Sequence, residues 1–296
     1  MISLSQTSLS TSIAAKYIND AEKIPFSPSE YSRFKYGSKE IARKYGYELA
    51  EAFIVYLKKG VWEEQLKQNI SIVVISSPYC FIPTATFAMK DYFIQRLNSF
   101  LISKNFPVVE ETKINRTITY KEDYGELSFE QRLNLIKNDS FTIDNAFCRG
   151  KLCIFLDDIR ITGSHELVIK NMLSFYRSKN SLDFIESHCM FLYYAILTNS
   201  DIPPQIENYL NYYSVKTLKD LDKIINNEDF LLNTRTVKFI LNYEHKECKE
   251  FFDYQRNKFL TNLYFQAIGN SYHLIPEYSL NLQYLKKLIQ KPWKTK

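Results

Sequence analysis

Short apolar segments alternate with segments of helical periodicity through the first two thirds of the chain. The apolar segments cover residues 70–75, 107–109, 152–156 and 188–197. Their length and composition fit buried strands. Because a strand followed by a helix is the repeating unit, the pattern favours a parallel sheet with helices on both faces. The sequence therefore predicts an α/β fold.

Helical segments separate the predicted strands. From residue 38, apolar residues such as Tyr45 and Leu49 recur at three- and four-residue spacing, which places them on one face of a helix. Two further helices are expected, one over residues 84–103 and one that begins at about Ser164. These helices would cover the sheet.

Composition divides the chain into three parts. Residues 1–30 are rich in Ser and Thr and contain two prolines, so they are predicted to form an N-terminal arm. Residues 31–200 carry the α/β pattern. Residues 201–296 have no strand pattern but contain helical stretches at 247–267 and 278–290, and they are predicted to form a helical C-terminal subdomain.

A polar segment interrupts the α/β pattern at residues 111–127. A long loop inside a compact domain is unusual and is often an active-site lid, so this segment is predicted to be one. The basic residues on it are Lys113, Arg116 and Lys121. The helix that follows is expected to begin at the capping box formed by Ser128 and Gln131.

Several classes of protein are excluded by composition. The chain has 38 basic and 33 acidic residues and a net charge of +5, which is too mild for a dedicated nucleic-acid binder. Its five cysteines form no CxxC pair, so the sequence does not indicate a zinc site. Scattered cysteines of this kind indicate a protein of a reducing compartment. The longest apolar run, residues 189–197, is too short for a membrane helix. We therefore expect a soluble cytoplasmic protein without a membrane partner.

The segment from Cys153 to Glu166 is the most informative about chemistry. An apolar strand is followed by Asp157 and Asp158, and then by the turn Thr162-Gly163-Ser164 at the start of a helix. Free backbone N–H groups at a helix N-terminus bind phosphate. The two carboxylates suit a pair of hydroxyls or the water shell of Mg²⁺. The pattern indicates a ribose 5-phosphate site, although an acid pair that only caps the helix is the alternative.

Two other phosphate-binding motifs are absent from the sequence. There is no G-x-x-x-x-G-K-S/T motif, which argues against a P-loop nucleotidase. There is also no G-x-G-x-x-G motif, which argues against a dinucleotide-binding Rossmann domain.

The strand followed by Asp-Asp-x-x-x-Thr-Gly-Ser resembles the phosphoribosyl diphosphate signature of type I phosphoribosyltransferases. The sequences at residues 31–37, 46–50, 77–84 and 157–166 resemble one subfamily, encoded in bacterial tellurium-resistance and stress-response gene clusters. The similarity covers roughly residues 30–200. It implies a type I phosphoribosyltransferase-like core with a parallel sheet flanked by helices, to which the helical C-terminal region is added.

The resemblance also implies roles for the residues of the motif. Asp157 and Asp158 match the acids that hold the ribose hydroxyls, and with them Mg²⁺, through water or through those hydroxyls. The 5-phosphate loop corresponds to Ile161, Thr162, Gly163 and Ser164. Arg160 within this loop and His165 beside it are further candidates for substrate binding.

The four residues that directly follow the first predicted strand match the position of the family's diphosphate loop. They are Ser76, Ser77, Pro78 and Tyr79. Many members carry Lys or Arg there, and this chain does not. Three residues on the predicted lid are expected to supply the missing charge by closing over the substrate: Lys113, Arg116 and Lys121. Arg33 and Lys35, which lie among aromatic residues, are expected to contact a phosphate or an acidic group of the substrate.

The resulting hypothesis is a Mg²⁺-dependent phosphoribosyltransferase of nucleotide metabolism. It would transfer ribose 5-phosphate from 5-phosphoribosyl-1-diphosphate to a nitrogenous base, or catalyse the reverse reaction. The alternative is a non-catalytic sensor or regulator with the same fold, which binds phosphoribosyl diphosphate or a nucleotide. The sequence does not identify the base, and it leaves the formation of a homodimer open.

Overall fold

A six-stranded sheet forms the centre of the protein. The computed structural model describes residues 11–58, 61–116, 141–178, 189–226 and 229–290. The strands are β1 (Thr11–Ile18), β2 (Ile72–Tyr79), β3 (Glu110–Arg116), β4 (Phe141–Thr142), β5 (Leu152–Arg160) and β6 (Cys189–Leu197). Their order is β1-β6-β5-β2-β3-β4, and every pairing is parallel except that of β3 with β4. The predicted α/β fold is confirmed.

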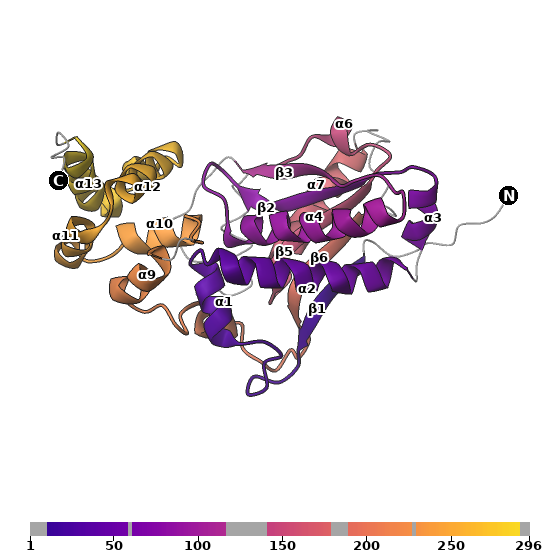
Figure 1. Cartoon of the computed structure of the whole chain (residues 1–296), viewed down its shortest axis with the longest axis horizontal. Coiled ribbons are helices and arrows are strands. Elements are labelled where there is room, and N and C mark those ends of the chain that lie inside the picture. The colour runs from indigo at the N-terminus through magenta and orange to yellow at the C-terminus, as the bar shows by residue number, and fades with distance from the viewer. Residues whose placement is uncertain (1–10, 59–60, 117–140, 179–188, 227–228, 291–296) are drawn as a thin grey trace.

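Helices cover both faces of the sheet and one of its ends (Figure 1). The helices of the first part are α1 (Pro28–Lys35), α2 (Lys39–Leu57), α3 (Val61–Lys67), α4 (Ala85–Ser103), α6 (Asn145–Cys148) and α7 (Ser164–Ser178). The later helices are α8 (Ile206–Asn211), α9 (Leu218–Ile225), α10 (Thr234–Leu241), α11 (His245–Tyr254), α12 (Asn257–Gly269) and α13 (Ser279–Ile289). Two short 3₁₀ helices, Tyr272–Leu274 and Pro276–Tyr278, lie between α12 and α13.

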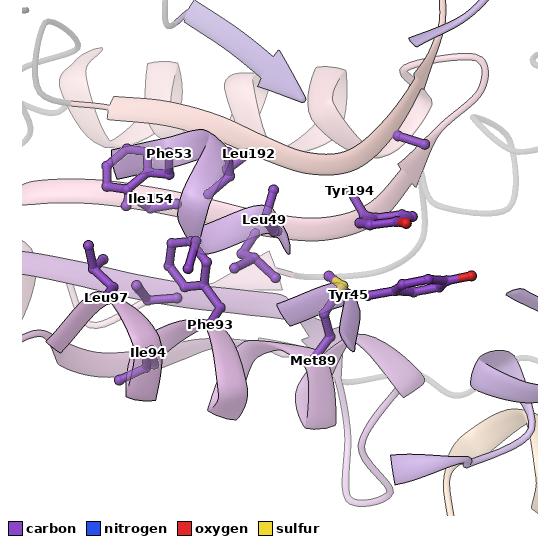
Figure 2. Packing of buried hydrophobic residues seen from close by; sticks show 14 of the residues in the cluster. Tyr45, Leu49, Phe53, Met89, Phe93, Ile94, Leu97, Ile154, Leu192 and Tyr194 are labelled. Carbon is purple, nitrogen blue, oxygen red and sulfur yellow. The ribbon is translucent and has the colours of Figure 1, made fainter. Parts of the chain in front are cut away.

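Alternate residues of the central strands pack on opposite faces. Ile72 and Val74 of β2 belong to the cluster that contains the apolar residues of α2 and α4. Val73 and Ile75 belong to the cluster on the other face, with residues of α7. Figure 2 shows the first cluster, in which Leu49, Phe53, Phe93 and Leu97 meet the strand residues Ile154 and Leu192. Since both faces are buried, the strands read as continuous apolar runs.

Gly46 lies where α2 contacts α4. A Cβ atom there would lie 2.5 Å from the Met89 carbonyl oxygen and 2.9 Å from the Phe93 amide nitrogen. Helix propensity alone predicts that Gly46→Ala stabilises the protein by about 1 kcal/mol. We expect the opposite sign, a loss of about 2 kcal/mol, because the two helices must separate. Urea denaturation measures the change in the free energy of unfolding. As a control, Val55→Ala at an exposed position of the same helix should change this free energy by less than about 0.5 kcal/mol. A stabilised Gly46→Ala would contradict the close packing.

Three strands differ in extent from the prediction. β2 continues through Ser76, Ser77, Pro78 and Tyr79, which were predicted to form a turn, and β5 continues past Asp157 and Asp158 to Arg160. The predicted strand at 107–109 was wrong, because the strand is β3, at Glu110–Arg116. Polar residues form strands here because parallel neighbours supply their hydrogen bonds: Ser76 pairs with both Lys113 and Leu156.

The segment predicted as an arm, residues 1–30, contains strand β1. Residues 11–18 pair in parallel with β6, with Ile13 opposite Leu192 and Ile18 opposite Leu197. The Ser- and Thr-rich composition was misleading, because an edge strand needs one apolar face only. Pro28 lies in the first turn of α1, where proline is tolerated.

The segment predicted as a lid is partly a strand. Residues 111–116 lie in β3 and pair with β2. The remaining residues of that segment, Lys121 among them, lie outside the described residues, as do Ser128 and Gln131 of the predicted capping box. The prediction that residues 111–127 form a loop was therefore wrong for its first six residues.

The later helices form a core of their own. Buried residues from α9 to α13, such as Leu221, Val237 and Leu263, make up this cluster, and Tyr36 and Ile82 of the first part join it. The stretch predicted at 247–267 is two helices, which break at Gln255 and Arg256. The helical character of this region is confirmed; the domain boundary near residue 200 stays a prediction.

Two further observations bear on the sequence analysis. None of the five cysteines is in a disulfide bond. Among the described residues, no helix is both long and apolar enough to cross a membrane.

Candidate functional site

A cleft of about 780 Å³ opens at the carboxyl end of β5. It lies between the sheet and the C-terminal helices, at the end of the sheet where Figure 1 shows α10 beside α1. Ligands of open α/β sheets bind at this edge. Asp157 and Asp158 on β5 and the turn before α7 lie on the wall that belongs to the sheet.

Asp158 is buried and accepts three side-chain hydrogen bonds. Its Oδ2 atom accepts from the Tyr31 hydroxyl at 2.7 Å and from Lys35 Nζ at 2.5 Å, and its Oδ1 atom accepts from Thr86 Oγ1 at 3.2 Å. Burial raises the pKa of Asp158, and Lys35 opposes this rise. The carboxylate is therefore fixed in position by helix α1 on one side and helix α4 on the other.

Asp157 is less enclosed than Asp158. Its Oδ1 atom accepts hydrogen bonds from Ser77 Oγ at 2.8 Å and from the Asp158 amide at 2.9 Å, and His165 Nδ1 lies 3.7 Å from Oδ2. Burial raises the pKa of Asp157, but the hydrogen bonds and the charge of His165 outweigh this effect, so the pKa is lowered. Asp157 is thus an ionised carboxylate at the surface of the cleft.

Thr86 connects the two acids. Its hydroxyl oxygen lies 3.2 Å from Asp157 Oδ1 and 3.2 Å from Asp158 Oδ1. The sequence analysis did not select Thr86. The sequence did contain a signal for Thr86, because this residue lies in the first turn of the helix predicted after the first strand. That turn and the end of β5 meet at the same edge of the sheet.

The turn between β5 and α7 has the features expected of a phosphate loop. Gly163 adopts a φ of +74°, a conformation that glycine adopts without strain. The hydroxyls of Thr162 and Ser164 lie 3.0 Å apart. Helix α7 begins at Ser164 and has fifteen residues, so its free N–H groups and its dipole are directed at this turn.

Arg160 lies over the turn and is held there by Glu166. A Cβ atom at Gly163 would lie 3.2 Å from Arg160 Nε, which shows how closely the guanidinium covers the turn. Arg160 Nε forms an ion pair with Glu166 Oε2 at 3.1 Å. The buried Glu166 also accepts from Lys170 Nζ at 2.5 Å and from the Tyr193 hydroxyl at 3.1 Å. The position of Arg160 is therefore set by a buried network.

The structure brings most of the predicted site residues to one cleft. Those that line it are Lys35, Ser77, Pro78, Arg116, Asp157, Asp158, Arg160, Ile161, Thr162, Gly163, Ser164 and His165. Arg33, Ser76, Tyr79 and Lys113 do not line it. Their predicted contact with the substrate is not supported by their positions.

Lys113 and Arg116, which were both expected to contact the substrate, differ in their position relative to the cleft. Lys113 Nζ lies 4.4 Å from the centre of the Tyr79 ring and donates to the Cys80 carbonyl at 3.3 Å. Arg116, at the end of β3, lies 5.9 Å from the centre of the Phe141 ring, and both of these residues line the cleft. Side chains three positions apart on a strand point to opposite faces, so only one of the two can face the cleft.

The opposite wall of the cleft comes from the C-terminal helices. Arg235, Lys238, Phe239 and Asn242 line it, and their spacing of three, four and seven residues places them on one side of α10. Of these four, the sequence marks only Arg235 as a candidate, because it is an isolated basic residue within Asn233-Thr234-Arg235-Thr236. The helical spacing was a signal, but it did not show which way the helix faces.

The family comparison agrees with this geometry. A family model described as PRTase ComF-like matches residues 9–285. The chain belongs to the ComF-like phosphoribosyltransferase family. No curated protein matches the chain. The ComF-like match includes β1 and the C-terminal helices as well as the predicted α/β core, so the family relationship covers both walls of the cleft.

Proposed function

We propose that the protein is a Mg²⁺-dependent phosphoribosyltransferase that uses 5-phosphoribosyl-1-diphosphate and a nitrogenous base. The observation that carries the proposal is that the acid pair and the Thr162-Gly163-Ser164 turn line the same cleft. A ribose 5-phosphate needs an anion site at one end and hydroxyl acceptors at the other. Membership of the ComF-like family supports a function of this general class.

In the proposed reaction, a ring nitrogen of the base attacks C1 of the ribose while the bond from C1 to the diphosphate oxygen breaks. The 5-phosphate would lie at the N-terminus of α7, beneath Arg160. The ionised Asp157 would accept hydrogen bonds from the ribose hydroxyls and stabilise the positive charge that develops on the ring. Asp158 would keep this carboxylate in place, since Thr86 contacts both acids.

The residues present fit Mg²⁺ as a partner of the substrate. Mg²⁺ is usually bound by one or two carboxylates together with water and substrate phosphates. Among the described residues, no group of three or more His, Cys, Asp or Glu side chains could hold a metal ion by itself. The Oδ2 atom of Asp157 has its partner, His165, at 3.7 Å, whereas the Oδ2 atom of Asp158 has partners at 2.7 and 2.5 Å. Asp157 is therefore the acid that would hold the ion. When bound, Mg²⁺ would neutralise charge on the departing diphosphate.

The sensor is the second candidate, and one observation favours it. Ser76, Ser77, Pro78 and Tyr79, at the position of the diphosphate loop, include no cation. A protein that binds phosphoribosyl diphosphate without releasing diphosphate would not need one there. The basic residues Arg116 and Arg160 line the cleft, and they support the enzyme because cations there would stabilise the charge of a departing diphosphate.

Titration calorimetry with 5-phosphoribosyl-1-diphosphate and Mg²⁺ tests the proposal. We expect the wild type to bind and Asp157→Asn/Asp158→Asn to bind at least about tenfold more weakly, because charge-assisted contacts are lost. Asp222→Asn/Asp253→Asn is the matched control, since both acids lie on the C-terminal helices and neither lines the cleft.

Diphosphate release would be measured in the same samples with a panel of purine, pyrimidine and pyridine bases. Binding with release supports the enzyme, and binding without release supports the sensor. If the wild type does not bind, or if the double variant binds as well as the wild type, the proposal is wrong.

A further inference from the structure

We propose that Glu166 is a positioning residue: it holds Arg160 over the Thr162-Gly163-Ser164 turn, in the orientation in which the guanidinium binds a phosphate monoester. Tyr193 and Lys170 contribute by holding Glu166. The inference rests on the proposed function, which places the 5-phosphate of the substrate at this turn. It names the group on which that anion site depends, and it can be tested with a ligand that carries no diphosphate.

Glu166 lies in the first turn of α7, and its side chain is buried. Three elements of the fold supply its partners. Lys170, one turn further along α7, donates to Oε1 at 2.5 Å, and the Tyr193 hydroxyl on β6 donates to Oε2 at 3.1 Å. Arg160 Nε on β5 lies 3.1 Å from the same Oε2 atom. Both oxygens of the carboxylate are therefore engaged.

The requirements of helix α7 do not explain why Glu166 is buried. A negative charge in the first turn of a helix is favourable even when it is exposed, whereas a buried carboxylate is costly unless charged partners and hydrogen bonds surround it. Burial raises the pKa of the Tyr193 hydroxyl, and Glu166 raises it further, so this hydroxyl keeps its proton and remains a donor. The network thus fixes the carboxylate in one place.

The guanidinium of Arg160 lies between Glu166 and the turn. A Cβ atom on Gly163 would lie 3.2 Å from Arg160 Nε and 3.3 Å from Nη2, so the glycine leaves the space that the guanidinium occupies. The nitrogen atoms of arginine form a rigid planar fork. Because Glu166 fixes the Nε side of this fork, it also fixes where the Nη atoms lie relative to the turn.

An arginine that is already ordered binds an anion more tightly than one that is free. The Arg160 side chain is partly exposed and lines the cleft. Without Glu166, it would lose conformational freedom when a phosphate binds, and that loss would weaken binding. With Glu166 in place, the guanidinium and the free N–H groups at the start of α7 are both preorganised as phosphate donors.

Glu166→Gln distinguishes positioning from simple electrostatics. Electrostatics alone predicts that this variant binds an anion more tightly, because a negative charge near the turn is removed. Positioning predicts weaker binding, because an amide has one acceptor oxygen and cannot hold Lys170 and Arg160 on two. We expect ribose 5-phosphate to bind to the full-length variant about three- to tenfold more weakly than to the wild type, as measured by titration calorimetry.

A double-mutant cycle with Arg160→Gln shows whether Glu166 acts through Arg160. The single variant Arg160→Gln should bind ribose 5-phosphate about tenfold more weakly than the wild type. In that background, Glu166→Gln should cause no further loss, because there is no guanidinium to position. A direct contact of Glu166 with the ligand, or a role in folding alone, would instead give the same loss in both backgrounds.

Glu48→Gln is the matched control. Glu48 also accepts a hydrogen bond from a tyrosine of β6, Tyr194, at 3.0 Å, and it pairs with a lysine, Lys16, at 3.2 Å. It does not line the cleft. This variant should bind ribose 5-phosphate as the wild type does.

Tyr193→Phe keeps the inference testable if circular dichroism shows that Glu166→Gln does not fold. This variant removes one hydrogen bond to Glu166 and no charge. It should weaken the binding of ribose 5-phosphate about threefold. In the Arg160→Gln background, Tyr193→Phe should have no effect on binding.

The inference is wrong if the folded Glu166→Gln or Tyr193→Phe binds ribose 5-phosphate as tightly as the wild type or more tightly. It is also wrong if the loss persists in the Arg160→Gln background, or if the wild type does not bind this ligand. Failure of the proposed function gives a different result. In that case, ribose 5-phosphate follows the expected cycle, but 5-phosphoribosyl-1-diphosphate releases no diphosphate with any base.

Discussion

Asp157→Asn is expected to lower the kcat/KM for diphosphate release by about 10²- to 10³-fold, which corresponds to about 3–4 kcal/mol of transition-state stabilisation. The amide keeps the size of the side chain and still accepts from Ser77 Oγ, which lies 2.8 Å from the carboxylate. What the variant loses is the negative charge that the lowered pKa of Asp157 maintains. The expected loss is therefore electrostatic rather than structural.

The measurement is the rate of diphosphate release with whichever base supports turnover in the wild type. Asp253→Asn is the control, because its carboxylate accepts from the Tyr284 hydroxyl at 2.7 Å on the C-terminal helices and is remote from the cleft lining. It should retain the wild-type rate. A rate for Asp157→Asn within threefold of the wild type would exclude a direct role for this acid in the transition state.

Lys35→Met is expected to lower the free energy of unfolding by about 3 kcal/mol at pH 7.5, because it leaves the buried Asp158 without its cation. Burial already raises the pKa of Asp158, and Lys35 is the main group that opposes the rise. Removal of Lys35 must therefore raise the pKa further. Tyr31 and Thr86 remain as hydrogen-bond donors, but neither carries a compensating charge.

The loss of stability should depend on pH. A carboxyl whose pKa is higher in the folded than in the unfolded state favours folding only while it is protonated, and this contribution disappears as the pH rises through the folded-state pKa. The difference in the free energy of unfolding between Lys35→Met and the wild type should thus be large at pH 7.5. It should shrink as the pH falls toward about 4, the unperturbed pKa of Asp.

Urea denaturation at a series of pH values measures this difference. Lys16→Met is the matched control: Lys16 Nζ lies 3.2 Å from Glu48 Oε2, in a pair whose side chains are about one third exposed. The Lys16→Met substitution should lower the free energy of unfolding by less than about 1 kcal/mol. A pH-independent loss in Lys35→Met would mean that packing of the lysine stem, and not the charge on Asp158, is what the protein requires.

The conformation of the Thr162-Gly163-Ser164 turn could be predicted from the sequence because all of its parts are local. The strand, the acid pair, Gly163 and the start of α7 follow one another within residues 152–166. Local sequence determines the turn conformation and the helix N-terminus. The sequence does not show where β5 ends, because Ile159 and Arg160 are in the strand through their pairing with β6.

The partners of the acids depend on spacing along a helix and on the order of the strands. Tyr31 and Lys35 are one turn apart on α1 and both reach Asp158, whereas Arg33 between them is directed elsewhere. The sequence analysis selected Arg33 together with Lys35 because composition does not separate the faces of a helix. The side of the cleft formed by α10 was missed, apart from Arg235, for a related reason. The direction that this helix faces is set by contacts with residues about 150 to 200 positions earlier in the chain.

The pairing of β1 with β6 has a consequence for biosynthesis. Thr11 lies opposite Met190, so a ribosome that adds 5–20 residues per second completes β6 roughly 10–35 s after it completes β1. During that interval residues 11–18 have no strand to pair with, and they would be open to chaperones or to other chains. Helix α10, which lines the other side of the cleft, is synthesised later still. A nascent chain would therefore carry the Thr162-Gly163-Ser164 turn before it has a cleft, and we expect ligand binding only after α10 has left the ribosome.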